Sequence, residues 1–437
     1  MVVLIFLKVE DSDVCAGAIG LEGPIIAQDL RKMTLGSHTS QLFCITFFGL
    51  CDFPAVTPYN VPFPSPKPAT QRPAVSGKTP LKIVHFSDIH VDHEYEVGAN
   101  TNCTKPICCR PYTSADAPGN NSYPAGEYGN YNCDAPVSLE ESMYAAIKEV
   151  APDATATLFT GDIVEGAVWL VNSTGNIADI NDAYSRMSGL KNLFATTGNH
   201  ESSPVNSFPP KAVGVTTNQW VYDTLSTNWI PFIGSTAASS ADSFGAYSTL
   251  LPGGNLRVIS INTNLYYKSN YWLYEATMET DPSGQLAWLV TELQAAETAG
   301  QRVYIIGHMP MGSNDALHDG SNYFNQITQR YSATIAALFF GKLFLNYYLL
   351  LANKIRSHSP RPISNHIQQL QLPNCSQRHR SILHHSLHDS HLRLSRLPRL
   401  LRRSRDIRYS WLHNLHRGLL SHFLHSISSN METLLLC

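Results

Sequence analysis

Four short apolar runs that end in polar, metal-type side chains constrain the fold of this 437-residue chain most strongly. Each run is rich in β-forming residues, and three of the four polar ends follow a glycine, which lets the backbone turn tightly. The four ends read Asp88-x-His90, Gly161-Asp162, Gly198-Asn199-His200-Glu201 and Gly307-His308. Because the carboxyl ends of parallel strands meet at one edge of a sheet, we expect these distant side chains to meet in space.

Strands and helices alternate through the middle of the chain, which predicts an α/β domain over residues 81–341. Two helices are expected there: one with a capping box of Ser138 and Glu141, and one that opens at Ser283. Residues 1–52 read as helical, and residues 53–80 contain eight prolines, which is typical of an extended linker. The strands are expected in LKIVHF, TATLFTGD, NLFATTGNHE, LRVISINTN, RVYIIGHMP and ATIAALFFG.

The donors at the strand ends suit metal ions, because Asp, His and Asn side chains together bind zinc, manganese or iron. A lone D-x-H, GD, GNH or GH is weak, since such dipeptides are common in turns. Four of them, each after a β-rich run, are much harder to obtain by chance. An Asp that bridges two ions about 3.5–4 Å apart is the design used for phosphate-ester hydrolysis. The pattern therefore predicts a two-metal phosphoesterase site.

Four of the nine cysteines lie in one 31-residue window from Cys103 to Cys133, with the spacing C-x4-CC-x23-C. That spacing suits either a zinc knot or two disulfides. Three N-glycosylation sequons lie in or near the window, at Asn102, Asn120 and Asn172. With the clustered cysteines they favour disulfides and a secretory setting. The first residues, MVVLIFLKVEDSD, match a signal peptide poorly because the apolar run is short.

Residues 342–437 differ in composition from the rest of the chain. From Gly341 onward there are 14 Lys and Arg against 3 Asp and Glu, together with 11 of the 18 histidines. Three interpretations are a His-rich metal tail, a basic nucleic-acid-binding arm, or translation in a wrong frame. The change falls inside a motif, directly after Gly341, and both acidic residues and glycines become rare there. We therefore expect this tail to be disordered or out of frame. A membrane span over 334–351 is disfavoured by Lys342 and Asn346.

With these motifs, the chain resembles the calcineurin-like metallophosphoesterases. HFSDIHVD, TGDIVEGAVW, TTGNHE and the cysteine window are similar to the acid sphingomyelinase branch, in a form typical of fungi, over about residues 10–341. The resemblance implies a layered β-sandwich flanked by helices. It implies that Asp88 and His90 hold one ion, Asn199 and His308 hold the other, and Asp162 bridges them. It also implies the disulfides Cys103–Cys108 and Cys109–Cys133.

The segment before the linker resembles the second half of a saposin-type domain, a helical unit that binds lipid and carries six cysteines. Cys15, Cys44 and Cys51 match the last three of those cysteines. The resemblance therefore implies that residues 1–52 form a partial saposin-like segment, whose cysteine partners lie upstream of Met1.

The activity that the resemblance implies is hydrolysis of sphingomyelin to ceramide and phosphocholine with two divalent ions, for which we expect zinc. His200 would lie over the phosphate and protonate the leaving alcohol, which is work suited to imidazole. We expect a monomer in a secreted or lysosome- or vacuole-like compartment. It would contact a lipid surface transiently and would not bind nucleic acid.

Three positions depart from the family pattern. After the last strand the family has Gly-His-x-His, whereas Gly341 is followed here by Lys342 and Phe344. Lysosomal relatives also have a histidine at the position of Gly166. The two missing histidines would supply one ligand to each ion. Without them each ion loses one contact, so we expect an impaired site. Two alternatives stay open: a phosphodiesterase for nucleotides or other soluble phosphodiesters, and a non-catalytic binding protein with a degenerate site.

Overall fold

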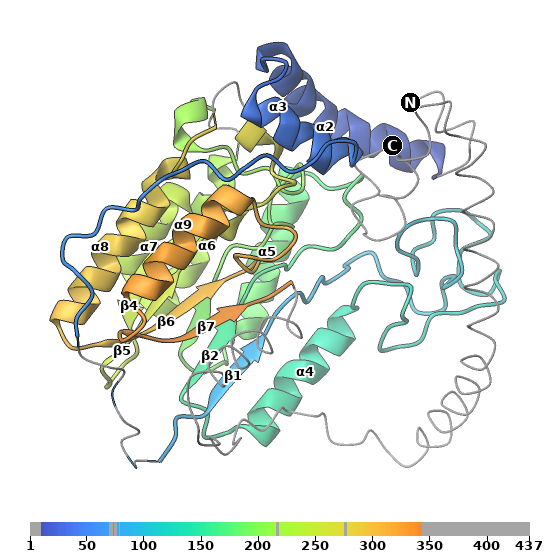
Figure 1. Ribbon diagram of the computed structural model, residues 1–437. Helices are drawn as coiled ribbons and strands as arrows, with labels where there is room; N and C mark the ends of the chain where they lie inside the picture. Colours follow the sequence, from blue (N-terminus) through green and yellow to red (C-terminus); the bar gives the residue numbers. More distant parts are fainter. Residues whose placement is uncertain are drawn as a thin grey trace, which may run out of the picture.

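The computed structural model describes residues 10–342, apart from 70–72, 74–76, 78, 216–217 and 275–277. Its centre is a pair of β-sheets packed against each other, with helices on the outer faces (Figure 1). Rings from opposite sheets touch, since His85 and Phe339 lie 5.5 Å apart between centroids. The expected layered β-sandwich flanked by helices is therefore confirmed.

The first sheet has three parallel strands, and the second has four strands of which only the first is antiparallel. In spatial order the first sheet holds β1 (Ile83–Phe86), β2 (Ala156–Phe159) and β3 (Leu193–Ala195). The second holds β4 (Tyr247–Leu250), β5 (Leu256–Ser260), β6 (Arg302–Gly307) and β7 (Ile335–Phe340). Parallel pairing carries the ends of β1, β2, β3, β6 and β7 to one edge of the sandwich.

Two hydrophobic cores hold the layers together. One lies between the sheets and the helices α4, α5, α6 and α7, and the other lies between the second sheet and α8 and α9. The helices of the α/β domain are α4 (Val137–Val150), α5 (Ser173–Met187), α6 (Gln219–Ile233), α7 (Ser235–Phe244), α8 (Gln285–Thr298) and α9 (His318–Arg330). The short helical turns are η2 (Lys211–Val213), η3 (Thr263–Tyr266), η4 (Tyr271–Tyr274) and η5 (Pro282–Gly284).

The six expected strands are all present, but the expected helix caps are wrong. α4 begins at Val137, so Ser138 falls inside the first turn and its hydroxyl donates to the carbonyl of Glu127. α8 begins at Gln285, and its free amides are satisfied by Asp281, whose carboxylate accepts from the N–H groups of Leu286 and Ala287. Asp281 therefore does the capping that was expected of a serine.

The cysteine window from Cys103 to Cys133 forms two disulfides, Cys103–Cys108 and Cys109–Cys133, and not a zinc knot. The expected disulfides are therefore confirmed. The expectation that Cys44 and Cys51 have partners only upstream of Met1 is wrong. The two residues are bonded to each other, because the turn of π-helix η1 (Cys44–Phe48) brings their Cα atoms to 5.7 Å, a distance that a disulfide spans. Cys15 is buried and free.

The N-terminal helices α2 (Ser12–Lys32) and α3 (His38–Phe43) lie on the α/β domain and not apart from it (Figure 1). Near the start of α2, Lys105 pairs with Asp11 and Asp13. Further along, apolar residues of α2, α3 and η1 share a cluster with η4. The proline-rich stretch follows α8 and α9, where Arg330 donates to the backbone of Ser65.

Within the described part of the chain, no helix has the length and apolar character needed to cross a bilayer. The first half of the disfavoured span is strand β7. The tail from 343 onward, Phe344 included, and the start of the chain up to residue 9 lie outside the described residues.

Close packing of α2 on the loop after β2 yields a first prediction, at Gly17. A Cβ added to Gly17 would lie 2.3 Å from the carbonyl oxygen of Trp169, so the helix would have to move away. We expect Gly17→Ala to lower the free energy of unfolding by about 1–3 kcal/mol in urea denaturation. Gly20 of the same helix meets nothing within 4 Å, so Gly20→Ala should raise it by roughly 1 kcal/mol. Equal effects of the two substitutions would contradict this packing.

Candidate metal centre

The loops that follow the strands converge on Asp162, which comes directly after β2. Its backbone carbonyl accepts hydrogen bonds from the N–H groups of Ile89 and His90, and one carboxylate oxygen accepts from the N–H of His200. Asp162 has a positive φ of 65°, an uncommon conformation that tends to mark functional sites. The bend leaves the second carboxylate oxygen facing the centre of the cluster.

Close approach of two loops explains the glycines of this region. A Cβ on Gly161 would lie 2.6 Å from the backbone nitrogen of Gly198, and a Cβ on Gly198 would lie 2.3 Å from the Asp162 carboxylate. Only glycine leaves room for the loops after β2 and β3 to touch. The glycines that the sequence placed before Asp162 and Asn199 therefore bring these two side chains together.

Two histidines point the same nitrogen toward the Asp162 carboxylate. Nε2 of His308 lies 3.2 Å from Oδ2 of Asp162, and Nε2 of His90 lies 3.5 Å from it. Nδ1 of His308 lies 2.7 Å from the carbonyl of Thr160, and Nδ1 of His90 lies 2.8 Å from that of Val164. A carbonyl only accepts, so each Nδ1 carries the hydrogen and each Nε2 is available for a metal ion.

Asn199 adds a third kind of acceptor, and a neighbour that the sequence did not single out orients it. The Asn199 side-chain N–H donates to Oδ1 of Asn206 at 2.8 Å, which turns the amide oxygen toward Nε2 of His308 at 2.7 Å. Nothing in the spacing of the motifs pointed to Asn206. Its role depends on a loop that returns to Asn199 after seven residues.

The donor atoms form two groups that share Asp162. One group is His90, Asp162 and His200, and the other is Asp88, Asp162 and His308, with donor atoms within 4.8 Å of one another in each. Carboxylate, amide and imidazole acceptors that face one another in a buried site need a cation between them. The donors therefore fit two metal ions that share one carboxylate. The expected division, with Asp88 and His90 on one ion and Asn199 and His308 on the other, stays a prediction.

The charge of Asp162 dominates the protonation of this cluster. Burial opposes ionisation, yet the charged His308 imidazole beside it holds the pKa of Asp162 well below its usual range. Burial also works against a charged His308, but the neighbouring Asp162 carboxylate raises the pKa of His308 to about 9. In the absence of metal, a proton on His308 thus supplies positive charge next to Asp162.

His200 has a different environment from the other two histidines. Burial lowers its pKa to about 3, and the ring stands edge-on to His90 with centroids 4.5 Å apart. Its Nδ1 lies 3.3 Å from the carbonyl of Glu165. The free protein therefore holds a neutral His200 at the edge of the centre.

The adjacent Glu201 is also buried, and burial raises the pKa of its carboxyl group to about 8. The Glu201 carboxyl group accepts a hydrogen bond from the N–H of Ile163.

Gly341 closes the centre at the end of β7. Its N–H donates to the carbonyl of His308, and a Cβ there would lie 2.8 Å from the Asp88 carboxylate. The ammonium of Lys342 donates to the hydroxyl of Tyr267 at 2.5 Å and lies over that ring. Its positive charge also works against protonation of His200 and His308 and lowers their pKa. Tyr267 is a neighbour that no sequence pattern indicated. Gly166 lies beside the carboxylate of Asp134, and it brings no side chain to the metal centre.

The three sequon asparagines Asn102, Asn120 and Asn172 are all exposed, as a glycan would require. Asn172 also caps α5, since its side chain accepts from the N–H of Gly175.

The known proteins to which this chain is similar are phosphoesterases. The calcineurin-like phosphoesterase family matches residues 81–341. The chain is 35% identical to sphingomyelin phosphodiesterase B of Dictyostelium discoideum over 347 residues, which are 77% of this chain and 52% of that protein. It is 36% identical to human sphingomyelin phosphodiesterase over 268 residues, 60% of this chain and 41% of that protein.

A further relative has a different substrate in its name. The human cyclic GMP-AMP phosphodiesterase is 30% identical over 282 residues, which cover 62% of this chain and 58% of that protein. The chain spans about half the length of these relatives.

The raised pKa of His308 predicts that metal binding releases protons. At neutral pH the imidazole is charged, and a metal ion must displace that proton. We expect zinc titration of metal-free protein in two buffers of different ionisation enthalpy to show about one proton released per chain. The release should fall away above pH about 9, where His308 is already neutral. His38→Asn, outside the centre, should change nothing, whereas a pH-independent titration would contradict the assignment.

Proposed function

Because this chain belongs to the calcineurin-like phosphoesterase family, we propose that it is a two-metal phosphodiesterase that cleaves sphingomyelin to ceramide and phosphocholine. The observation that carries the proposal is the pair of donor groups around Asp162. The relatives named sphingomyelin phosphodiesterase, at 35% and 36% identity, support the substrate. The mixture of imidazole, amide and carboxylate donors supports zinc as the metal.

The side chains of the chain itself have separable tasks in this proposal. Asp88, His90, Asn199 and His308 would hold the two ions, with Asp162 between them. Bound ions would polarise the phosphoryl oxygens and activate a water molecule. Thr160, Val164 and Asn206 keep the donor atoms turned inward through the hydrogen bonds described above, so the site is preorganised.

His200 is the proposed general acid for the departing alkoxide. It reaches the centre from the loop after β3, and its backbone N–H is fixed by Asp162. Burial keeps its imidazole neutral in the free protein. A phosphodiester anion bound next to it would favour the imidazolium, because an opposite charge within a few ångströms raises a histidine pKa. No other imidazole takes the position of Gly166, so this role would rest on His200 alone.

We also propose that this chain is impaired relative to its family. Lys342 occupies the first position at which the resemblance implies a histidine, and its ammonium is bonded to Tyr267 instead of contributing a donor. An ammonium nearby also works against two dications. The loss of merely orienting neighbours costs about 10–100-fold in metal affinity, so the loss of ligands should cost at least that much.

The setting of the protein belongs to the same proposal. Three disulfides and exposed sequons support an oxidising, secretory route to the outside or to a lysosome-like compartment. We propose that the protein acts as a monomer that meets lipid surfaces transiently.

A second candidate function has a specific observation in its favour. The relative named cyclic GMP-AMP phosphodiesterase matches this chain at 30% identity, which supports a soluble nucleotide or another soluble phosphodiester as substrate. A third candidate is a binding protein with a degenerate site, which Lys342 supports.

Restoring the missing histidines tests these proposals together. We expect Lys342→His with Phe344→His to bind zinc at least 10–100-fold more tightly than the natural chain and to release phosphocholine from sphingomyelin vesicles faster. Metal content per chain is measured by elemental analysis and phosphocholine by an enzyme-coupled assay.

Asp162→Asn in the restored protein is the control, and it should lose both metal and activity. If the restored protein binds two ions but hydrolyses only a cyclic dinucleotide, the lipid substrate is wrong. If it binds two ions and hydrolyses neither, the binding-protein reading stands.

A further inference from the structure

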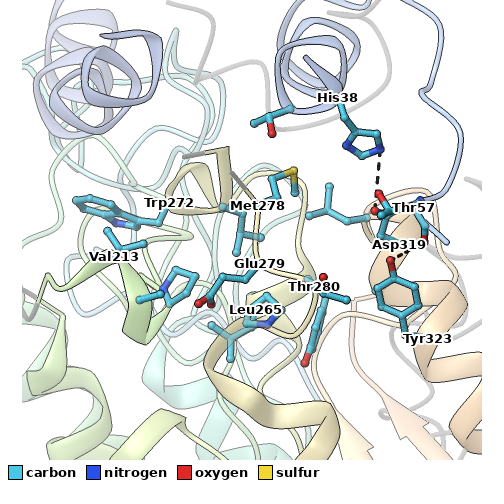
Figure 2. A pocket seen from close by; sticks show the side chains of 18 of the residues that line it. His38, Thr57, Val213, Leu265, Trp272, Met278, Glu279, Thr280, Asp319 and Tyr323 are labelled. Atoms are coloured by element: carbon cyan, nitrogen blue, oxygen red, sulfur yellow. Dashed lines mark hydrogen bonds and ion pairs between the residues drawn. The ribbon is translucent and has the colours of Figure 1, made fainter. Parts of the chain in front are cut away.

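A cavity of about 430 Å³ lies beside the loops that lead to the candidate metal centre. Its walls come from residues 93–94 and 110–112, from the loop after β2 and from the first turns of α5. The volume falls in the range of about 300–1,000 Å³ that small-molecule sites have. The larger cavity shown in Figure 2 has a different character, since Val213, Trp272 and Met278 give it a mainly apolar lining.

Acidic side chains dominate the charged lining of the smaller cavity. The carboxylates of Glu94, Glu165 and Asp179 line it, together with the guanidinium of Arg110. Arg110 is already paired, because its Nη2 lies 2.7 Å from the carboxylate of Asp92 and 3.0 Å from that of Glu165. The cavity therefore has an excess of negative charge.

Asp179 shows the effect of this excess. Burial first, and then the negative charge of Glu165, raise the pKa of Asp179 to about 6. The His93 imidazole does not satisfy the Asp179 carboxylate, because its Nε2 lies 3.7 Å from Oδ1 of Asp179, beyond the reach of a hydrogen bond. The same Nε2 lies 3.5 Å from the carboxylate of Asp182. A positively charged ligand would relieve the repulsion between Asp179 and Glu165.

A buried acceptor atom also faces the cavity. Asn176 lines it, although only 1% of this residue is exposed. The Asn176 side-chain N–H group lies 3.4, 3.3 and 3.2 Å from the backbone carbonyls of His200, Glu201 and Ser202 and donates to them. The amide is thereby fixed with its oxygen turned away from that loop, and no donor of the described residues is bonded to this oxygen. A ligand that donates a hydrogen bond would remove the cost of leaving the oxygen unpaired.

The remaining walls favour an organic ligand over a bare metal ion. Tyr112, Leu170 and Val171 give the cavity apolar surface, which suits the hydrocarbon part of a small molecule. Within the described part of the chain, each group of side chains with the spacing of metal ligands includes Asp162. None of those groups includes a carboxylate of this cavity.

From these observations we propose that the cavity binds a small organic cation with a primary ammonium group. Asn176 and Asp179 lie three residues apart on α5 and therefore share one face of the helix. The three N–H donors of an ammonium would match the Asn176 oxygen and the carboxylates of Asp179 and Glu165. The site adjoins the metal centre, because the Glu165 carbonyl lies 3.3 Å from Nδ1 of His200, but it does not depend on the proposed phosphodiesterase activity.

Binding of ethanolamine tests the proposal. The full chain is titrated calorimetrically at pH about 8, where Asp179 is ionised, once with zinc and once with a metal chelator. We expect one molecule bound per chain with the same affinity in both cases, since no donor around Asp162 lines the cavity. Choline keeps the charge but has no N–H group, so it should bind at least about tenfold more weakly. Equal binding of choline and ethanolamine, or binding that requires zinc, would overturn the proposal.

Substitution of the acidic residues locates the site. Asp179→Asn keeps the shape of the side chain but removes its charge, and it should weaken ethanolamine binding at least about tenfold. Glu94→Gln, at the exposed edge of the cavity, should weaken binding less, by up to about fivefold, because exposed ion pairs contribute little. Glu149→Gln, exposed on α4, is the matched control and should bind like the natural chain. If Asp179→Asn and Glu94→Gln both bind ethanolamine as the natural chain does, the ammonium lies elsewhere and the proposal fails.

Discussion

The contacts of the buried residue Asp162 are the interactions on which the rest of the structure depends. The Asp162 backbone carbonyl accepts hydrogen bonds from the loop after β1, and one oxygen of its carboxylate accepts from the loop after β3. The other carboxylate oxygen faces His308 from the second sheet. One residue thereby ties both sheets at the same edge. A buried charge is costly unless it is paired and hydrogen-bonded, so these partners must be in place together. The fold and the centre are therefore specified by the same contacts.

Much of this centre could be predicted from the sequence because its information is local. A β-rich run, a glycine and a polar residue occupy adjacent positions, and parallel strands bring such ends together. The parts that could not be predicted depend on contacts between distant residues. Asn206 matters only because its loop returns to Asn199, and Asp281 caps α8 only because the chain bends at η5. Strand β4 is short and half exposed, so it gave no clear pattern.

The N-terminal helices pack on loops near the centre from two directions, although they contribute none of the donor atoms. Gly17 packs against Trp169, in the loop that begins at Asp162. On the other side, α2 and α3 pack against η4, where the Trp272 indole donates to Ser207 at 2.7 Å. Ser207 follows Asn206, which orients Asn199. The N-terminal segment, for which the sequence predicts a partial saposin-like unit, therefore packs on loops that lead to the candidate metal centre.

At the end of β7 the fold and the chemistry depend on different residues, the fold on Gly341 and the proposed chemistry on position 342. Gly341 must be glycine, because any side chain would strike Asp88, and its N–H is bonded to the carbonyl of His308. These contacts involve only the backbone at 341, so they hold whatever residue follows. Lys342 finds a favourable place against the ring and hydroxyl of Tyr267 without disturbing β7. A change at 342 can therefore remove a ligand while the sandwich stays intact, so an intact fold in this family does not by itself imply a complete site.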